Sequence, residues 1–274
     1  MIYSRFTDQD LEQYNIEGFL IKKGFFSAEE VELLYGTSLE DDVLGKHSFD
    51  LNDQQGLKTK LALWFTPGED VYGAYSTCSR IFRAVEKILG GAPAHFHSKL
   101  MQKEPKVGGA WEWHQDYGYW YKNGFLYPQM TSVMVALTKA NRENGCLQVL
   151  KGSHLLGRIE HGFAGEQVGA DQKIIDVCLD RGMELVYVEL DPGDTLFFHC
   201  NLLHRSDANN SDQARWSLIS AYNLATNKPF RVEAPVSSWT PISERPDDAL
   251  LNTGHKGLDL KADFLEKEKD IGLK

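Results

Sequence analysis

The first 92 residues show apolar positions at helical spacing, interrupted by one short apolar segment at 18–21 that fits a strand. Capping patterns at 7–10 and 27–30 predict the starts of two helices. In both, Ser or Thr is followed three residues later by an acidic residue, which satisfies free N–H groups of a first turn. Apolar side chains at helical spacing over 72–89 predict a third helix that packs on the core and ends at Gly90.

From residue 94 the pattern changes to short apolar segments separated by Gly, Asn and Asp, which predict β-strands. Helices followed by many short strands predict a mainly β fold with flanking α: a double-stranded β-helix (jelly roll, cupin-like) barrel buttressed by N-terminal helices. The long polar segment 155–182 is expected to be an insertion, often a lid beside a site. We expect one domain over 1–274, with a helical N-terminal region at 1–92, a jelly-roll core at 93–225 and a C-terminal extension at 226–274. The predicted strands are 95–103, 111–116, 130–138, 146–150, 185–190, 194–200 and 215–223.

Composition and charge restrict the function. The chain of 274 residues has a formal net charge of −10 and a pI of about 5.4, which argues against nucleic acid or an anionic membrane as a partner. We see no signal segment at the start and no apolar run long enough to span a bilayer. The widely spaced cysteines fit reduced thiols that pack as small apolar side chains. These features predict a cytoplasmic protein.

His114, Asp116 and His204 form a candidate metal site. Two imidazoles and one carboxylate are the ligands of a mononuclear non-haem Fe(II) oxygenase, which leaves the other metal positions for a co-substrate and O₂. On a strand, His114 and Asp116 would point to the same side. The tripeptide alone also fits a surface turn, but aromatic residues flank it and a strand-like segment carries the later His. His199 competes with His204 as third ligand, although its odd offset on that segment would face it away.

Arg215 opens a further apolar segment, eleven residues beyond His204. A guanidinium on a strand beside the second His is placed to hold a dicarboxylate through two parallel hydrogen bonds. The triad and Arg215 together predict a catalytic layout.

With these residues the chain resembles the phytanoyl-CoA dioxygenase family of Fe(II)/2-oxoglutarate-dependent oxygenases, which includes ectoine hydroxylases. The resemblance covers residues 11–222. It implies an enzyme that uses Fe(II), 2-oxoglutarate as co-substrate and O₂ to hydroxylate a C–H bond of a small molecule, with succinate and CO₂ as co-products. The segments that carry it are 18–21, 113–116, 144–154, 192–199 with His204, and Arg215.

The resemblance also implies a co-substrate pocket. Arg215 would pair with the distal carboxylate of 2-oxoglutarate. Ser206, two residues past the metal His, faces the same side of an extended strand and would donate a hydrogen bond. Lys99, Lys60 and Met134 stand at positions that relatives place near this pocket. For either lysine, a solvated surface charge is an equally acceptable interpretation.

Three residues are candidates for the substrate side of the site. Trp120 keeps the aromatic residue that ectoine hydroxylases have four positions past the metal Asp, and Tyr119 precedes it. His97 stands where those enzymes have an amide, so their substrate contact is not preserved. These side chains fit either a substrate pocket or packing at the barrel mouth. Because the sequence shows no basic cluster suited to a phosphoadenosine, we expect a small polar metabolite rather than an acyl-CoA.

Other functions use similar ligands. A non-catalytic metal-binding cupin-like sensor or structural protein would not require Arg215. A zinc hydrolase would need a general base near the motif, and none is evident. A halogenase would carry a small residue in place of the carboxylate ligand, whereas Asp116 is present. The Fe(II)/2-oxoglutarate-dependent hydroxylase is therefore the favoured function.

Overall fold

Two antiparallel sheets face each other in the computed structural model, which describes residues 3–164, 167–230, 238–259 and 262–265. Within these ranges the larger sheet has eight strands and the smaller sheet has four. Across the larger sheet the order is β1 (Phe19–Lys22), β11 (Thr195–His199), β6 (Met130–Ala136), β13 (Arg215–Leu224), β4 (Pro93–Lys103), β3 (Lys58–Trp64) and β2 (Phe49–Asn52), with β14 (Thr240–Pro241) paired to β4. The smaller sheet runs β10 (Leu185–Val188), β7 (Leu147–Leu150), β12 (His204–Ser206) and β5 (Trp111–His114).

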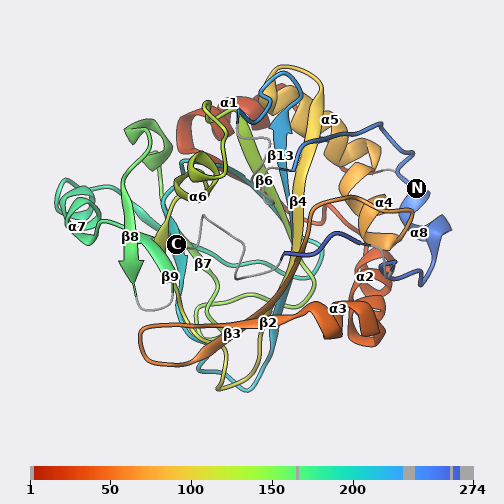
Figure 1. Cartoon of the computed structure of the whole chain (residues 1–274), viewed down its shortest axis with the longest axis horizontal. Helices are drawn as coiled ribbons and strands as arrows, with labels where there is room; N and C mark the ends of the chain where they lie inside the picture. Colours follow the sequence, from red (N-terminus) through yellow and green to blue (C-terminus); the bar gives the residue numbers. More distant parts are fainter. Residues whose placement is uncertain (1–2, 165–166, 231–237, 260–261, 266–274) are drawn as a thin grey trace.

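Helices cover the outer face of the larger sheet. Leu34, Ile81 and Val133 belong to the core between helices and sheet, whereas Met134, on the other face of β6, packs with Val149 in the core between the two sheets. Figure 1 shows α2, α4 and α5 on one side of β4 and the strand β7 on the other. This arrangement is the double-stranded β-helix expected from the sequence. The helices are α1 (Asp8–Glu17), α2 (Ala28–Glu40), α3 (Asp42–His47), α4 (Val71–Thr77), α5 (Ser79–Leu89), α6 (Asp116–Lys122), α7 (Gln172–Asp180), α8 (Ala249–Thr253) and the 3₁₀ turn η1 (Ser153–Leu156).

The helix starts predicted from capping patterns are confirmed. Thr7 and Ser27 each form a complete capping box, at the starts of α1 and α2. The single helix predicted over 72–89 is instead two helices, because Cys78 between them has extended backbone angles. The backbone N–H of Arg80 donates to Asp247 from the C-terminal region of the chain, which supplies the new first turn with an acceptor.

The N-terminal region expected to be helical also supplies three strands. Only 18–21 was predicted as a strand, and it forms β1; β2 and β3 were not predicted. β3 alternates exposed lysines with buried Thr59 and Leu61, so one face of this edge region is strongly polar. The segment 155–182, expected as an insertion, contains the hairpin of β8 (His161–Ala164) and β9 (Gln167–Ala170), followed by α7. Figure 1 shows the hairpin and α7 together at the edge of the molecule, away from α2 to α5.

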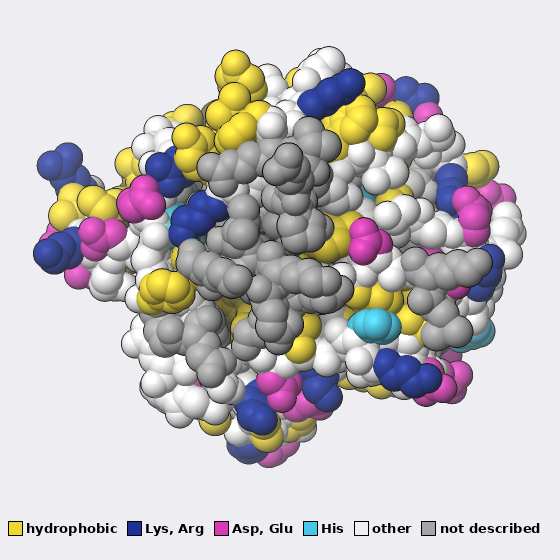
Figure 2. All heavy atoms as spheres, in the orientation of Figure 1, with side chains coloured by type: hydrophobic (Ala, Val, Ile, Leu, Met, Phe, Trp, Pro, Cys, Tyr) yellow, Lys and Arg dark blue, Asp and Glu magenta, His cyan; other side chains and the backbone are white. Residues whose placement is uncertain are grey.

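The surface and the cysteines agree with the composition. Figure 2 shows acidic and basic side chains interspersed around the described surface of one face. Among the described residues, no helix combines the length and apolarity that crossing a bilayer requires. The cysteines are all buried and unpaired, as expected: Cys78, Cys146, Cys178 and Cys200.

His95, which is buried, and His199, which is half-buried, lie outside the candidate metal site and are expected to make the fold less stable in mild acid. Burial lowers the pKa of His95 and of His199 from the usual 6.5 to about 4. Between these values the unfolded chain binds a proton at each position and the folded chain does not. The free energy of unfolding therefore falls as the pH drops from about 6.5 towards 4, by about 3 kcal/mol for each histidine.

The variant His199→Gln tests this expectation. His199 Nδ1 accepts a hydrogen bond of 3.0 Å from the backbone N–H of Asn201, and the glutamine oxygen offers a replacement acceptor. Urea titrations between neutral pH and about pH 5 should show a shallower loss of stability in the variant than in the parent. Equal pH dependence in both proteins would show that His199 does not contribute.

Candidate active site

The predicted metal ligands come together where the smaller sheet meets α6. His114 ends β5 and His204 opens β12, and the two lie directly opposite each other in the register of these paired strands. Asp116 is the first residue of α6 and does not belong to a strand, contrary to the expectation from the sequence. Gln115 between the two ligands has an extended backbone, so the chain still directs His114 and Asp116 to the same side.

The triad has the geometry of a metal site. Asp116 Oδ1 lies 3.9 Å from Nε2 of His114 and 3.9 Å from Nε2 of His204, and one ligand atom from each residue lies within 4.8 Å of the others. All three side chains are buried. Two imidazole nitrogens and one carboxylate oxygen fit a divalent metal with open positions, such as non-haem Fe(II).

Backbone carbonyl groups fix which nitrogen of each imidazole is protonated, so that the other nitrogen can coordinate a metal. His114 Nδ1 lies 2.7 Å from the carbonyl oxygen of Glu112, and His204 Nδ1 lies 2.9 Å from that of Leu202. A carbonyl only accepts, so each Nδ1 carries the proton and each Nε2 presents its lone pair to the metal position. Burial lowers the pKa of both imidazoles, which keeps them neutral at physiological pH.

Ser132 orients the carboxylate ligand. Its hydroxyl, on β6, donates a hydrogen bond of 2.9 Å to Asp116 Oδ2. This bond occupies one carboxylate oxygen and leaves Oδ1 towards the two histidines. Ser132 was not identified from the sequence, because a serine on a buried strand has no distinguishing local signal.

Replacing Ser132 with alanine should raise the dissociation constant for Fe(II) by roughly 10-fold, since Asp116 would lose the hydrogen bond that fixes its orientation. Anaerobic equilibrium titration of the apoprotein with Fe(II) measures this change. Ser220→Ala is a matched control, because Ser220 is also buried and hydrogen-bonded, to Ser98 at 2.7 Å, but lies outside the site. Similar Fe(II) affinity in both variants would contradict the role of Ser132.

The β8–β9 hairpin fixes the turn that carries His114 and Asp116. The backbone N–H of Gln115 donates to His161 Nε2 at 2.9 Å, and His161 Nδ1 donates to the carbonyl of Ile159 at 2.8 Å. The His161 ring also lies over Gly118, where an added Cβ would stand 2.3 Å from the ring. The insertion expected beside the site therefore positions the metal ligands, and Gly118 is required for this close approach.

A small cavity adjoins the metal position and contains four of the residues predicted for the co-substrate. Lys99, Met134, Ser206 and Arg215 all line it. The two metal histidines form part of its wall, together with apolar side chains of both sheets. The structure thus brings these residues to one place, beside the triad.

Arg215 is the most unusual group in this cavity. Its side chain is buried, and within the described residues it has no ion pair and its Nε has no hydrogen-bond partner. Burial lowers the pKa of the guanidinium to about 10. A buried cation without a counter-charge is strongly unfavourable, so the site is suited to an anion.

Lys103 is a second buried cation near this cavity and was not predicted. It lies opposite Arg215 in the β4–β13 register, and its Nζ donates to Ser206 Oγ at 2.7 Å and to the carbonyl of Asp207 at 2.6 Å. Burial, and next the charge of Arg215, hold the pKa of Lys103 well below its usual value. The lysine thus fixes the hydroxyl oxygen of Ser206.

Lys60 does not reach the co-substrate pocket. It is exposed on β3, between Thr59 and Leu61, which are buried. Because neighbouring side chains of a strand point to opposite faces, Lys60 points away from the cavity that Leu61 lines. The prediction that placed it near 2-oxoglutarate is therefore corrected, and its alternative as a solvated surface charge fits the structure.

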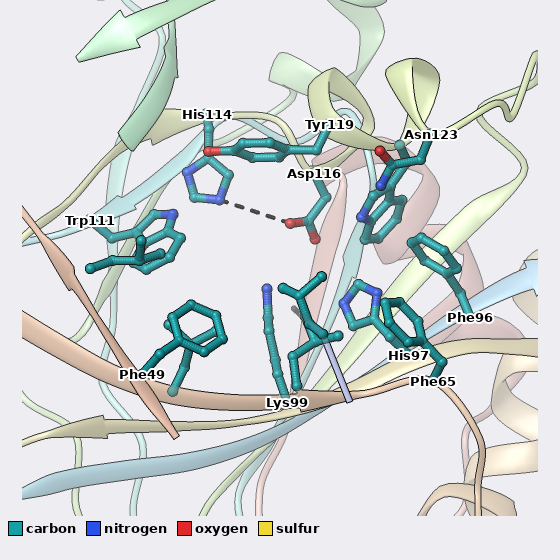
Figure 3. Close-up of a pocket in the computed structure, with 15 residues that line it drawn as sticks. Phe49, Phe65, Phe96, His97, Lys99, Trp111, His114, Asp116, Tyr119 and Asn123 are labelled. Atoms are coloured by element: carbon teal, nitrogen blue, oxygen red, sulfur yellow. Dashed lines mark ion pairs between the residues drawn. The ribbon is translucent and has the colours of Figure 1, made fainter. Parts of the chain in front are cut away.

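A second cavity, called the main cavity below, also borders the triad (Figure 3). His97, Tyr119 and Trp120, the substrate candidates from the sequence, all line it together with His114 and Asp116. The Tyr119 ring packs edge-on against His114 at 5.5 Å between ring centroids, and its hydroxyl donates to the carbonyl of Val168. Lys99, predicted for the co-substrate pocket, lines this cavity as well. The remaining lining residues, which the sequence did not identify, are Phe49, Leu51, Leu61, Leu63, Phe65, Phe96, Trp111, Asn123 and Leu265.

His199, the competing ligand, lies outside the site. Its ring packs against His154 at 5.4 Å and Tyr14 at 6.5 Å between centroids. His199 was expected to face away because of its odd offset on one strand. It does lie outside the site, but for another reason: it ends β11 in the larger sheet, whereas His204 opens β12 in the smaller sheet after a turn. His154 donates a hydrogen bond of 3.0 Å through Nε2 to the carbonyl of Asn15.

The sequence model of the family described as Phytanoyl-CoA dioxygenase (PhyH) matches residues 14–217, which include the triad and Arg215. The chain belongs to this family. Its relatives include the L-proline trans-4-hydroxylase of Streptomyces griseoviridis, 28% identical over 184 residues, which are 58% of this chain and 67% of that protein. The ectoine dioxygenase of Halomonas elongata is 24% identical over 260 residues, covering 84% of this chain and 77% of that protein.

Solved structures show the same fold as this member of the phytanoyl-CoA dioxygenase family. EctD from S. alaskensis with bound Fe has a TM-score of 0.71 and 21% sequence identity, with 88% of each chain covered. The same protein with 2-oxoglutarate and 5-hydroxyectoine has a TM-score of 0.68 and 20% identity, again with 88% of each chain covered.

Proposed function

We propose that this protein is an Fe(II)- and 2-oxoglutarate-dependent dioxygenase that hydroxylates a C–H bond of a small molecule. The observation that carries the proposal is the buried Arg215, which has no ion pair among the described residues and lines a cavity together with the metal histidines. A triad alone is compatible with a metal sensor. A buried cation beside the triad supplies the counter-charge that the distal carboxylate of a dicarboxylate co-substrate needs. Membership of the family and relatives named as dioxygenases and hydroxylases support the same reaction.

Bound Fe(II), 2-oxoglutarate and O₂ would supply the oxidant: one oxygen atom enters the product hydroxyl and the other enters succinate, as CO₂ is released. The chain provides the setting for this reaction. Ser132 holds Asp116 towards the metal position, and backbone carbonyls keep Nε2 of His114 and His204 free to coordinate. Burial of the triad excludes bulk water from the reacting centre.

The co-substrate would occupy the small cavity. Arg215 and Ser206 would hold its distal carboxylate, with Lys103 fixing the Ser206 hydroxyl from behind. Met134 would pack against the methylene groups. Lys99 lines both cavities, so its ammonium group stands between the co-substrate and the substrate.

The alternatives weighed from the sequence fit less well. A sensor or structural metal protein gives Arg215 no anion to bind. A zinc hydrolase requires a general base near the metal. Asp116 is the one carboxylate among the described residues that line either cavity, and it is a metal ligand itself.

The test is spectroscopic. Anaerobic protein should bind one equivalent of Fe(II), and addition of 2-oxoglutarate should produce a weak visible metal-to-ligand charge-transfer band. The band requires open metal positions for the keto acid, which a triad of this kind leaves. Its absence in folded, iron-loaded protein would overturn the proposed function.

A further inference from the structure

The main cavity presents a mostly apolar wall. Phe49 on β2, Leu61 and Leu63 on β3, Phe96 on β4 and Trp120 on α6 all line it. A substrate that enters would therefore meet mainly hydrocarbon and aromatic surface. This lining is less polar than we expected from the sequence.

The charged side chains that line the main cavity are assigned to the metal and to the co-substrate. Asp116 Oδ2 accepts from Ser132, and Oδ1 faces the two metal histidines, so the carboxylate has no oxygen left for a substrate cation. Lys99 also lines the small cavity with Arg215, where the proposed function places a dicarboxylate. Among the described lining residues no other side chain is charged at neutral pH. A charged substrate group would thus be buried without its own counter-charge, which is strongly unfavourable.

His97 places in the wall a polar atom that has no hydrogen-bond partner within the described part of the chain. His97 is buried, and among the described residues its Nε2 has no hydrogen-bond partner. Its ring packs between Phe96, at 4.6 Å, and Trp120, at 5.7 Å between centroids, and Figure 3 shows it directed into the cavity. Burial holds the pKa of His97 well below its usual value, so the imidazole is neutral. A buried polar atom without a partner is unfavourable, and a ligand atom that forms a hydrogen bond with it would recover this loss.

We propose that the main cavity takes an uncharged, largely apolar substrate that presents one oxygen or nitrogen to Nε2 of His97. This proposal rests on the proposed function, because it treats the main cavity as the substrate side of the iron site. From the charges of the described lining residues, it disfavours zwitterions and cations as substrates, and it assigns His97 a role in substrate binding.

Four probes, each a benzene ring with one substituent, test whether the main cavity prefers uncharged ligands. They are toluene, benzyl alcohol, benzylamine and benzoate. Each is titrated calorimetrically into the anaerobic protein with Fe(II) and 2-oxoglutarate. Toluene and benzyl alcohol should bind at least about 10-fold more tightly than benzylamine and benzoate, because only the charged probes bury an unpaired ion. Equal or tighter binding of either ion would overturn the proposal, as would failure of all four probes to bind at millimolar concentration.

The role of His97 is tested by the ratio of the affinities for benzyl alcohol and toluene, measured in each protein. His97→Phe keeps an aromatic ring but removes Nε2. Benzyl alcohol should therefore bind roughly 3- to 10-fold more weakly than to the parent, whereas the affinity for toluene should be unchanged. His97→Gln restores a polar group and should recover part of the preference for benzyl alcohol. His199→Phe, which replaces a half-buried histidine outside the cavity, should leave the ratio unchanged. An unchanged ratio in His97→Phe would overturn this assignment.

The proposed function and the inference about the substrate are tested by different measurements. The charge-transfer band reports on iron and 2-oxoglutarate, whereas calorimetry reports on the main cavity and does not require turnover. If the band is absent, the proposed function fails. If the band forms but benzylamine or benzoate binds best, the inference about the substrate fails and the proposed function stands.

Discussion

His204→Ala should weaken Fe(II) binding by more than about 100-fold, because loss of a ligand costs more than loss of a ligand's hydrogen-bond partner, which typically costs 10- to 100-fold. The substitution removes one of the three atoms that converge on the metal position, and the two that remain cannot define one face of the metal. Anaerobic titration with Fe(II) measures the affinity directly. The charge-transfer band with 2-oxoglutarate should disappear as well.

His199→Ala provides the matched control for this prediction. It removes an imidazole from the neighbouring strand β11, one whose ring faces His154 rather than the triad. Fe(II) affinity should therefore remain within a few-fold of the parent. Loss of Fe(II) binding in His199→Ala but not in His204→Ala would mean that the triad is assigned to the wrong histidine.

The metal ligands could be predicted because their signal is local. His114 and Asp116 are two residues apart, and His204 and Arg215 lie on strand-like segments whose alternation indicates a common side. The β-helix architecture followed from many short apolar segments after residue 94, and its helices from capping patterns. These inferences need only neighbouring residues, whereas the assignment of His204 to the same site as His114 and Asp116 rests on the resemblance to the family.

The site residues that the sequence did not reveal depend on contacts between distant strands. Lys103 at the end of β4 reaches Ser206 on β12 only in the folded chain, and Ser132 meets Asp116 only where β6 lies beside α6. Lys60 shows the opposite error: its basic character matched the family, but the pleat of β3 turns it outwards. A one-residue difference in register decides which face a side chain takes, and sequence periodicity alone does not fix it.

The substrate side was the least predictable region for the same reason. Its apolar wall comes from β2, β3, β4 and α6, with Leu265 from the C-terminal region of the chain. None of these residues differs in type from an ordinary core residue, so their sequence pattern indicates packing. Their position beside the triad is visible only in the folded chain.

Arg215→Leu should raise the apparent KM for 2-oxoglutarate by roughly 10- to 100-fold, because a charge-assisted pair contributes about 1.5–3 kcal/mol and about 1.4 kcal/mol corresponds to one decade. Leucine fills much of the buried space and leaves the triad intact, so Fe(II) affinity should stay close to that of the parent. Arg215→Lys should recover only part of the loss, since an ammonium group cannot form the planar two-bond contact.

Arg205→Leu is the matched control, because Arg205 lies between His204 and Ser206 on β12 but stacks on Trp113 and bonds Gln148 instead of lining the cavity. Its KM for 2-oxoglutarate should be unchanged. Steady-state succinate formation with varied 2-oxoglutarate separates the variants, and Fe(II) titration confirms that each metal site is intact. If Arg215→Leu binds 2-oxoglutarate as tightly as Arg205→Leu, the small cavity is not the co-substrate site. The assignment of the metal site would then remain supported, but the proposed reaction with 2-oxoglutarate would not.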